Sequence, residues 1–586
     1  MTRTGSRLLA AAVCAGGVGL VVWYCTRLPE AGLPIALVLV AALTWSTIAF
    51  ALNAVVGAGT GPDTDTSTAP EDGEDDEDSD AHDVTTVVVA TEDDPDEVVR
   101  TSIALAQAAG PVVLVDLAAA PRRSLASGLG VVLAEGDGTQ GAIDAALEQV
   151  DTLCVAVVRA RACVVAGEML AAARRVTGDV GWVTGRTEAY NDDGFSPAYG
   201  RSIGDALREH ARTSGLPMWA PDATVVRTEA AISAGGFRSD RPWGSMLRRM
   251  AAAGFRGSTH DGVITAVAAP AEAEPFWRIR VAEARAEVAE ATDALVSPGI
   301  TGSRAWVSRA RAAGLVMRDL RGWVMLAWLL AFGAVAATGA APVASQVWLW
   351  SGLVVVYAAA RAVVTGLQSG MASDPGAELV SAVYEFPISL SATAGLARRS
   401  APIRAVSQMA SLVPSRLLAW AAILVSACTV VGALELAGVI SVKAQAQQPW
   451  GIAGCVALVV AFCAGMWRAH GLRRSGRVSF RFPVVMPVSI GGRHGHTDDV
   501  SPGGLRVRGT LAPLSVGDTI SIDVITPTGV VTMQADVRWT YPDGDETVAG
   551  LSLAMADSTL AEWTRTVFAA ADVLRPRAEE RVRAPV

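Results

Sequence analysis

The stretch VTTVVVATEDDPDEVVRTSIALAQAAGPVVLVD, residues 84–116, decides the fold of the largest soluble part of the chain. It opens with an apolar run over residues 84–90, typical of a strand that is buried on both faces. Residues 96–109 then read as an amphipathic helix, and residues 111–116 form a second apolar strand. Strand, helix and strand in this order predict a parallel sheet covered by helices.

The same alternation continues beyond this stretch. Helical patterns lie at residues 140–149 and 167–175, and another apolar strand lies at residues 153–158. We therefore predict an α/β domain with a largely parallel sheet. Ligands often bind at the carboxyl ends of the strands in such folds, so the pattern alone indicates only a nucleotide-binding type of domain.

Six apolar stretches outside this domain are about as long as a membrane-spanning helix. They form three hairpins and lie at residues 8–24, 33–56, 323–341, 347–364, 417–442 and 450–467. Arginines gather before the first, third and fifth stretches and after the fourth and sixth, whereas the turns within the hairpins carry almost none. Because positive charge favours the cytoplasmic side, this pattern predicts six spans with both termini and all soluble parts in the cytoplasm.

Charge is distributed unevenly along the 586 residues. Eleven acidic residues, and no lysine or arginine, lie between Asp63 and Asp83, so this tract alone exceeds the formal net charge of −10. Such a tract, poor in large apolar residues, predicts a disordered spacer. The seven cysteines form no CxxC pair, which argues against a disulfide framework or a zinc site, and we expect no bound metal.

The chain follows a third pattern after the last apolar stretch. Short strands alternate with turns as far as residues 548–554, and residues 559–571 read as a helix. Many short strands with a closing helix predict a small antiparallel β-barrel.

Two motifs mark this C-terminal part. An R-x-x-x-R motif is followed, 22 residues after its second arginine, by a D-x-S-x-x-G motif. The residues concerned are Arg473, Arg474, Arg477, Asp499, Ser501 and Gly504. This combination resembles the PilZ domain, a receptor for the bacterial second messenger cyclic di-GMP. The resemblance implies that these residues bind the messenger, because guanidinium groups pair with phosphate and guanine and a carboxylate accepts from guanine N–H groups. Arg481 with Arg477 offers another register.

Several segments of the α/β domain resemble family 2 glycosyltransferases. They are TEDDPDEVVR at 91–100, the strand ending in Asp116, GAIDAAL at 141–147 and VVRTEAAISAGGF at 225–237. The resemblance implies a GT-A-like fold, with Thr91, Asp94 and Asp116 near a nucleotide-sugar.

The catalytic motifs of that family are not kept. Its D-x-D pair, which holds a divalent metal against the diphosphate, would fall where Arg159 and Arg161 stand. An arginine side chain cannot coordinate a cation. The region of the family's general base leaves Asp240 as the nearest acid, and TGSRAW at 301–306 lacks the glutamine of the acceptor motif. We therefore predict a catalytically silent domain, and Asp240 is the candidate catalytic residue should the domain be active.

The order of the parts resembles the catalytic subunit of bacterial cellulose synthase. SAVYEFP at 381–387 resembles a segment between its membrane hairpins, and SLVPSR at 411–416 lies where that family has a gating loop. A short amphipathic helix at the membrane surface is the other interpretation of SLVPSR, and residues 303–320 read as such a helix too.

The resulting fold class is a six-span α-helical membrane protein with a cytoplasmic GT-A-like α/β domain and a C-terminal PilZ-like barrel. We expect a multi-pass protein of the bacterial inner membrane that binds cyclic di-GMP and regulates polysaccharide synthesis, secretion or another envelope function. The alternative is an active processive glycosyltransferase that polymerises a UDP-sugar, needs Mg²⁺ and exports the polymer under cyclic di-GMP control. Expected partners are cyclic di-GMP, membrane lipid and other polysaccharide-synthesis or envelope proteins, but no nucleic-acid polymer.

The domain boundaries follow from these patterns. We expect a membrane hairpin at 1–58, an acidic linker at 59–83, the GT-A-like domain at 84–300, an interface helix at 301–322, a hairpin at 323–366, an interface segment at 367–416, a hairpin at 417–467, the PilZ domain at 468–575 and a tail at 576–586.

Overall fold

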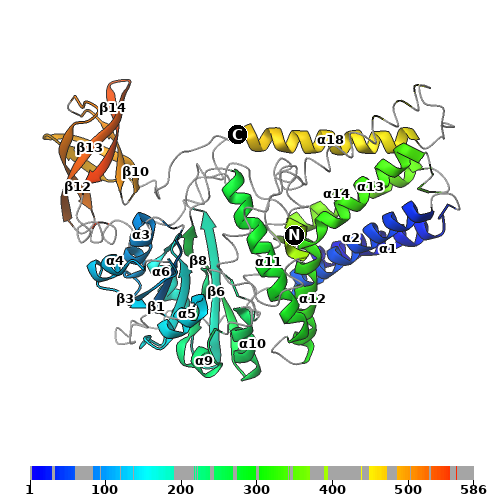
Figure 1. Cartoon of the computed structure of the whole chain (residues 1–586), viewed down its shortest axis with the longest axis horizontal. Coiled ribbons are helices and arrows are strands. Elements are labelled where there is room, and N and C mark those ends of the chain that lie inside the picture. The colour runs from blue at the N-terminus through cyan, green and yellow to red at the C-terminus, as the bar shows by residue number, and fades with distance from the viewer. Residues whose placement is uncertain are drawn as a thin grey trace.

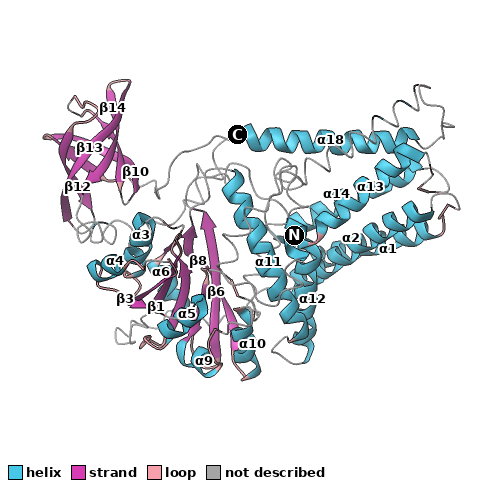
Figure 2. Cartoon of the chain, in the orientation of Figure 1, coloured by secondary structure: helices cyan, strands magenta, loops and turns pink. Residues whose placement is uncertain are grey.

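The structure is a computed structural model in which helices, a helix-covered sheet and a barrel are distinct parts (Figure 1, Figure 2). It describes residues 3–29, 33–59, 84–92, 94, 96–118, 121–135, 138–189, 217, 219–220, 222–237, 243–267, 273–297, 302–338, 340, 342–343, 347–369, 388–393, 430, 434, 437, 448–471, 485–501, 503–511, 513–526, 529–554 and 563.

An eight-stranded sheet forms the α/β domain, in the order β3-β2-β1-β4-β7-β6-β8-β5. The strands are β1 (Val84–Ala90), β2 (Val112–Asp116), β3 (Val132–Ala134), β4 (Cys154–Arg159), β5 (Ala162–Val164), β6 (Val180–Ala189), β7 (Thr224–Arg227) and β8 (Arg256–Val267). Strands β3, β2, β1 and β4 run parallel, as do β6 and β8. The prediction of a largely parallel sheet is thus confirmed for this part, whereas β7 and β5 are antiparallel to their neighbours.

Helices cover the sheet, and apolar side chains fill the space on each face. The helices are α3 (Asp96–Ala106), α4 (Arg123–Gly128), α5 (Gly138–Leu147), α6 (Ala166–Ala173), α9 (Thr228–Ser233) and α10 (Gly244–Ala252). Strand β1 is buried at every position. Its Val84 and Val88 belong to one apolar cluster, and Val87 and Val89 belong to another. Because successive side chains point to opposite faces, the apolar run at the start of this domain supplies both layers of the core.

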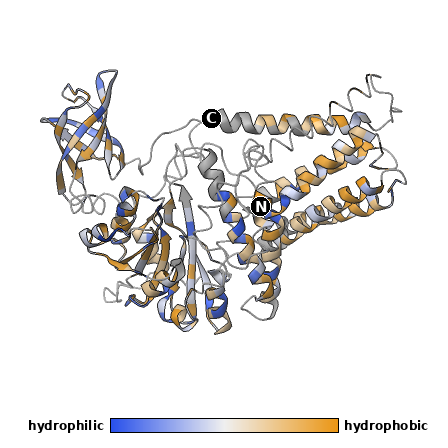
Figure 3. Ribbon diagram, in the orientation of Figure 1, coloured by the Kyte–Doolittle hydropathy of each residue, from blue (hydrophilic) through white to orange (hydrophobic). Residues whose placement is uncertain are grey.

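Long apolar helices form the membrane part, which is largely orange in Figure 3. They are α1 (Arg3–Cys25), α2 (Leu33–Gly59), α13 (Arg321–Thr338), α14 (Val347–Ser369) and α18 (Gln448–Gly471). Four helices of the described part, not six, are long and apolar enough to cross a membrane, namely α1, α2, α13 and α14. The predicted span at 417–442 lies outside the described residues except for three of them, and the one at 450–467 lies within α18.

Two helices connect the sheet domain to the membrane helices. They are α11 (Ala273–Val296) and α12 (Gly302–Asp319), which pack against each other, and α12 also packs against α2. Helix α12 coincides with the predicted interface helix, and its Trp306 is exposed. The segments 381–387 and 411–416 lie outside the described residues.

A closed antiparallel barrel lies near the C-terminus, with the order β10-β11-β14-β13-β12-β9. Its strands are β9 (Pro487–Ile490), β10 (Arg493–Ser501), β11 (Gly504–Gly509), β12 (Thr519–Thr526), β13 (Gly529–Asp543) and β14 (Glu546–Ala554). The prediction of a small antiparallel barrel is confirmed. Its buried apolar cluster is continuous with Val98 and Leu105 of α3 and includes Trp563, the one described residue of the predicted closing helix.

One side of the barrel requires a glycine. Ala549 and Leu551 of β14 are buried in the barrel core, so Gly550 between them faces outward. A bulge in β13 between Val537 and Trp539 places Trp539 opposite Gly550. A Cβ atom at Gly550 would overlap the indole ring of Trp539.

We expect Gly550→Ala to destabilise β13 and β14 by about 1–3 kcal/mol, because the added methyl group displaces the indole from a filled position. Hydrogen exchange of the amides of these strands in the full-length chain measures the change. In a Trp539→Ala background the same substitution has nothing to displace, so its cost falls towards zero. An equal cost in both backgrounds would contradict this explanation.

Candidate functional site

The three residues predicted to contact a nucleotide lie together at the carboxyl edge of the sheet. Strands β1 and β2 run parallel, with Ala90 paired to Asp116. The loop after β1 carries Thr91 and Asp94, while Asp116 ends β2. The sheet therefore brings Thr91, Asp94 and Asp116 to one place, as the resemblance to glycosyltransferases implies.

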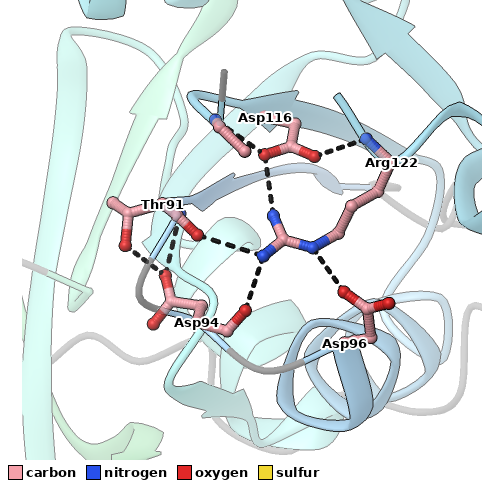
Figure 4. A network of polar contacts seen from close by, with 6 residues as sticks. Thr91, Asp94, Asp96, Asp116 and Arg122 are labelled. Carbon is pink, nitrogen blue, oxygen red and sulfur yellow. Dashed lines mark hydrogen bonds and ion pairs between the residues drawn. The ribbon is translucent and has the colours of Figure 1, made fainter. Parts of the chain in front are cut away.

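An arginine of the same chain occupies the space between these residues (Figure 4). The Arg122 guanidinium donates from Nη1 to Asp116 Oδ1 at 2.8 Å and from Nε to Asp96 Oδ1 at 2.6 Å. Its Nη2 donates to the carbonyl oxygens of Thr91 at 3.2 Å and Asp94 at 2.5 Å. One guanidinium thus joins the loops that follow β1 and β2.

The Asp116 carboxylate has no exposed surface, and both of its oxygens accept hydrogen bonds from groups of the same chain. Its Oδ2 accepts from the backbone N–H of Arg122 at 2.7 Å, and its Oδ1 also accepts from the backbone N–H of Ala118 at 3.1 Å. Burial acts to lower the pKa of Arg122, but the hydrogen bond to Asp96 and the charge of Asp116 raise that pKa overall. The arginine therefore stays charged and paired.

Arg159 and Arg161, where the resemblance to family 2 glycosyltransferases predicts the metal-binding aspartates, form ion pairs. Arg159 donates from its backbone N–H and from Nε to the two carboxylate oxygens of Asp222, each at 2.7 Å, and the charge of Asp222 raises its pKa. Arg161 Nε donates to Asp94 Oδ1 at 2.7 Å. The other carboxylate oxygen of Asp94 accepts from the N–H and hydroxyl of Thr91. Each of these carboxylates is therefore held by a guanidinium.

Asp222 reaches its position through an uncommon backbone conformation. Its φ is +63°, a value that aspartate tolerates better than most residues. Its backbone oxygen accepts from the Thr265 hydroxyl at 2.8 Å, which fixes the turn before β7. Sequence reasoning missed both Asp222 and Arg122, since each lies in a loop without periodic pattern.

The remaining motifs of the glycosyltransferase resemblance are only partly described. Asp240 lies outside the described residues. Trp243, near the position that the resemblance predicts for the general base, packs edge-on against Trp219 and Phe237 beside the apolar core. Within the described ranges, no group of three or more His, Cys, Asp or Glu side chains could hold a metal ion.

The barrel motif lies where β10 turns into β11. In the antiparallel register of β10 and β11, Asp499 lies opposite Arg506 and Ser501 lies opposite Gly504. The buried Ser501 hydroxyl donates to the Gly504 carbonyl at 2.9 Å, and a Cβ at Gly504 would lie 2.6 Å from the carbonyl oxygen of Leu551. Ser501 and Gly504 therefore shape the turn. Arg473, Arg474, Arg477 and Arg481 lie outside the described residues.

One outward-facing row crosses four strands beside this motif. Asp499 lies opposite Arg506, Arg506 lies opposite Gly550, and Gly550 lies opposite Trp539. Trp539 stacks on Tyr541 with ring centroids 5.7 Å apart, and Arg506 Nη2 donates to the Tyr541 hydroxyl at 3.3 Å. Sequence reasoning missed both neighbours of Asp499 because two bulges change the register: one in β10 between Thr497 and Asp499 sets the partner Arg506, and one in β13 between Val537 and Trp539 places Trp539 in the row.

Comparison with known proteins identifies the C-terminal part. Residues 472–567 match the family model of the PilZ domain. No curated protein matches the chain.

Among solved structures, the chain is similar to mannosyltransferase PcManGT from Pyrobaculum calidifontis in complex with GDP-Man and Mn²⁺. The two are 16% identical with a TM-score of 0.40, over 66% of this chain and 99% of that one. Two structures of S. aureus TarS 1–349 also match, one of them in complex with UDP-GlcNAc. They are 13% and 12% identical, each with a TM-score of 0.26, over 49% of this chain and 92% and 90% of theirs.

We expect Arg122→Met to destabilise the α/β domain by about 1–3 kcal/mol, because it leaves the Asp116 carboxylate buried with fewer donors. A thermal melt of the full-length chain should shift downward by about 2–4 °C for each kcal/mol. Arg123→Met is the matched control, because Arg123 pairs with Glu135 at the exposed surface, where an ion pair contributes at most about 1 kcal/mol. Equal shifts for the two variants would contradict a structural role of Arg122.

Proposed function

We propose that this chain is a membrane-bound receptor for cyclic di-GMP whose glycosyltransferase-like domain is catalytically silent. In this proposal it regulates polysaccharide synthesis, secretion or another envelope function. The observation that carries the receptor role is the PilZ match of residues 472–567, since PilZ domains bind this messenger.

The barrel supports the proposal with a surface of suitable chemistry. Cyclic di-GMP presents two phosphates and two guanines. Asp499 can accept from guanine N–H groups, and the arginines at 473, 474 and 477 can pair with phosphate or with guanine O6 and N7. Trp539 and Arg506 lie in the same row as Asp499. A flat indole and a guanidinium are good partners for a purine face.

The carboxyl edge of the sheet supports the absence of catalysis. Sugar transfer from a nucleotide-sugar needs a positive charge beside the diphosphate leaving group. In family 2 glycosyltransferases a metal ion supplies this charge. The carboxylates of Asp94, Asp116 and Asp222 are held by Arg161, Arg122 and Arg159. A metal ion at these carboxylates would have to displace guanidinium groups from short ion pairs.

The membrane arrangement belongs to the same proposal. The four apolar helices support a membrane protein, and the arginine distribution favours six spans with both termini in the cytoplasm. With this topology the barrel and the α/β domain face the compartment in which cyclic di-GMP is made. The proposal keeps the domain boundaries predicted from the sequence, with the PilZ domain at 468–575 and the GT-A-like domain at 84–300.

We expect the full-length chain in nanodiscs to bind cyclic di-GMP, and Asp499→Ala to weaken binding about 10- to 100-fold, the loss expected for one charge-assisted hydrogen bond. Isothermal titration calorimetry measures it. Asp523→Ala on β12 is the matched control, because its carboxylate accepts from the exposed Thr532 hydroxyl on the neighbouring strand, away from the row that holds Asp499. Binding that survives Arg473→Ala and Arg477→Ala together would refute the proposed site.

We also expect purified membranes containing the chain to turn over no UDP-sugar, with or without Mg²⁺ and cyclic di-GMP. Release of UDP, followed by a coupled assay, is the measurement, and membranes without the chain are the control. Mg²⁺-dependent turnover that Asp240→Asn abolishes would establish the active alternative instead, in which the chain polymerises a UDP-sugar.

A further inference from the structure

Helix α3 is buried on two of its faces. Val99, Ile103 and Ala106 belong to the apolar cluster of the sheet. Val98 and Leu105 are seven residues apart, so they share another face of the helix, and they are only 7% and 0% exposed. A helix that covers a sheet normally buries one apolar stripe and leaves the opposite side to solvent. A second part of the chain therefore covers α3.

The barrel is the part that covers this second face. Val98 and Leu105 belong to the apolar cluster that forms the barrel core, and Figure 1 shows the barrel beside the end of the α/β domain that carries α3. The edge strand β5 joins the same cluster through the fully buried Cys163. We call this contact the apolar seam. Its members outside the barrel strands are Val98, Leu105, Cys163, Val165, Ala266, Met486 and Trp563.

Met486 connects the seam to the residues proposed to bind the messenger. It follows Arg477 in the sequence and immediately precedes β9. Its backbone N–H donates to Thr497 Oγ1 at 2.8 Å, and its carbonyl oxygen accepts from the Thr497 N–H at 2.9 Å. Thr497 is fully buried and precedes Asp499 at the bulge of β10. The two segments that carry the proposed messenger site thus meet at Met486, which is buried in the seam.

The other end of α3 carries ion pairs of the sheet edge. The helix begins at Asp96, whose carboxylate accepts from Arg122 Nε at 2.6 Å. Asp94, in the loop just before it, accepts from Arg161 Nε at 2.7 Å. Because a helix transmits displacement as a rigid element, a movement of α3 against the barrel also changes the positions of these two carboxylates.

We propose that α3 couples the messenger site of the barrel to the carboxyl edge of the sheet through the apolar seam. Cyclic di-GMP that binds Arg477 and Asp499 together fixes the position of Met486 and tightens the seam against α3. The ion pairs at the start of α3 then open less often. This inference rests on the proposed receptor role and names the regulation that follows from it.

Hydrogen exchange of the full-length chain in nanodiscs, with and without saturating cyclic di-GMP, tests the coupling. We expect the backbone amides of residues 91–106 to exchange about fivefold more slowly when the messenger is bound, the low end of the range for coupled sites. A ligand that makes a segment more rigid is sufficient for this effect, without any change of fold. Isothermal titration calorimetry of the same preparation measures messenger binding separately.

Two neighbouring valines of α3 provide the matched variants. Val98→Ala removes methyl groups from the seam and should abolish most of the slowing. Val99→Ala removes the same groups from the cluster of the sheet and should keep the slowing. Val98→Ile keeps the seam apolar and should keep it too. The exchange of the β1 amides without messenger shows whether each variant is folded.

The outcomes separate this coupling from the receptor role itself. Messenger binding that leaves the exchange of residues 91–106 unchanged, or makes it faster, would overturn the coupling and leave the receptor role intact. An equal loss of slowing in Val98→Ala and Val99→Ala would also overturn the coupling, because the seam would then have no role of its own. Absence of messenger binding to the unaltered chain would overturn the receptor role and the coupling with it.

Discussion

Pairing between guanidinium groups and buried carboxylates holds the carboxyl edge of the sheet together. Arg122 ties the loop after β1 to the loop after β2, and Arg161 ties Asp94 to the turn after β4. Arg159 ties the end of β4 to Asp222 before β7. A buried pair of this kind is often no more stabilising than an apolar contact of the same shape, but removing one partner is costly because a charge remains in a poorly solvated position. The buried aspartates Asp94, Asp116 and Asp222 at this edge therefore each require their arginine.

The same chemistry continues from the sheet towards the membrane. Arg159 Nη1 lies 3.8 Å from Glu283 Oε1 of α11. Three further carboxylates of α11 form ion pairs with arginines of neighbouring helices. These are Glu290 and Asp293 with Arg248 of α10, and Glu287 with Arg318 of α12. Helix α12 packs on α2, where Trp45 donates to the Met317 carbonyl at 3.2 Å. At the other side of the sheet domain, the barrel core is continuous with α3. The α/β domain thus packs against the barrel through α3, and α11 and α12 connect it to the membrane helices.

The periodic patterns of the sequence predicted most of the fold, whereas the contacts of single loop residues could not be predicted from it. The run at 84–90 predicted a strand buried on both faces, and β1 supplies both layers of the core. Thr91, Asp94 and Asp116 could be grouped in advance because adjacent parallel strands end at one edge. Arg122 could not, since a loop position says nothing about where a long side chain will reach. The position of Trp539 could not be predicted for another reason. A one-residue bulge changes which residues share a face of the sheet, and the sequence of β13 contains no pattern that predicts this bulge.

Charge balance at the sheet edge supports the proposal that this domain is catalytically silent. Three arginines, Arg122, Arg159 and Arg161, lie among the four aspartates Asp94, Asp96, Asp116 and Asp222. A diphosphate approaching this edge meets cations that are already neutralised, within a set whose sum is negative. A free Mg²⁺ ion would have to compete with guanidinium groups that are tethered at their carboxylates and hence present at a high effective concentration. In the alignment that the resemblance predicts, an arginine in place of a metal-binding aspartate does more than remove a ligand, because its guanidinium also occupies a neighbouring carboxylate.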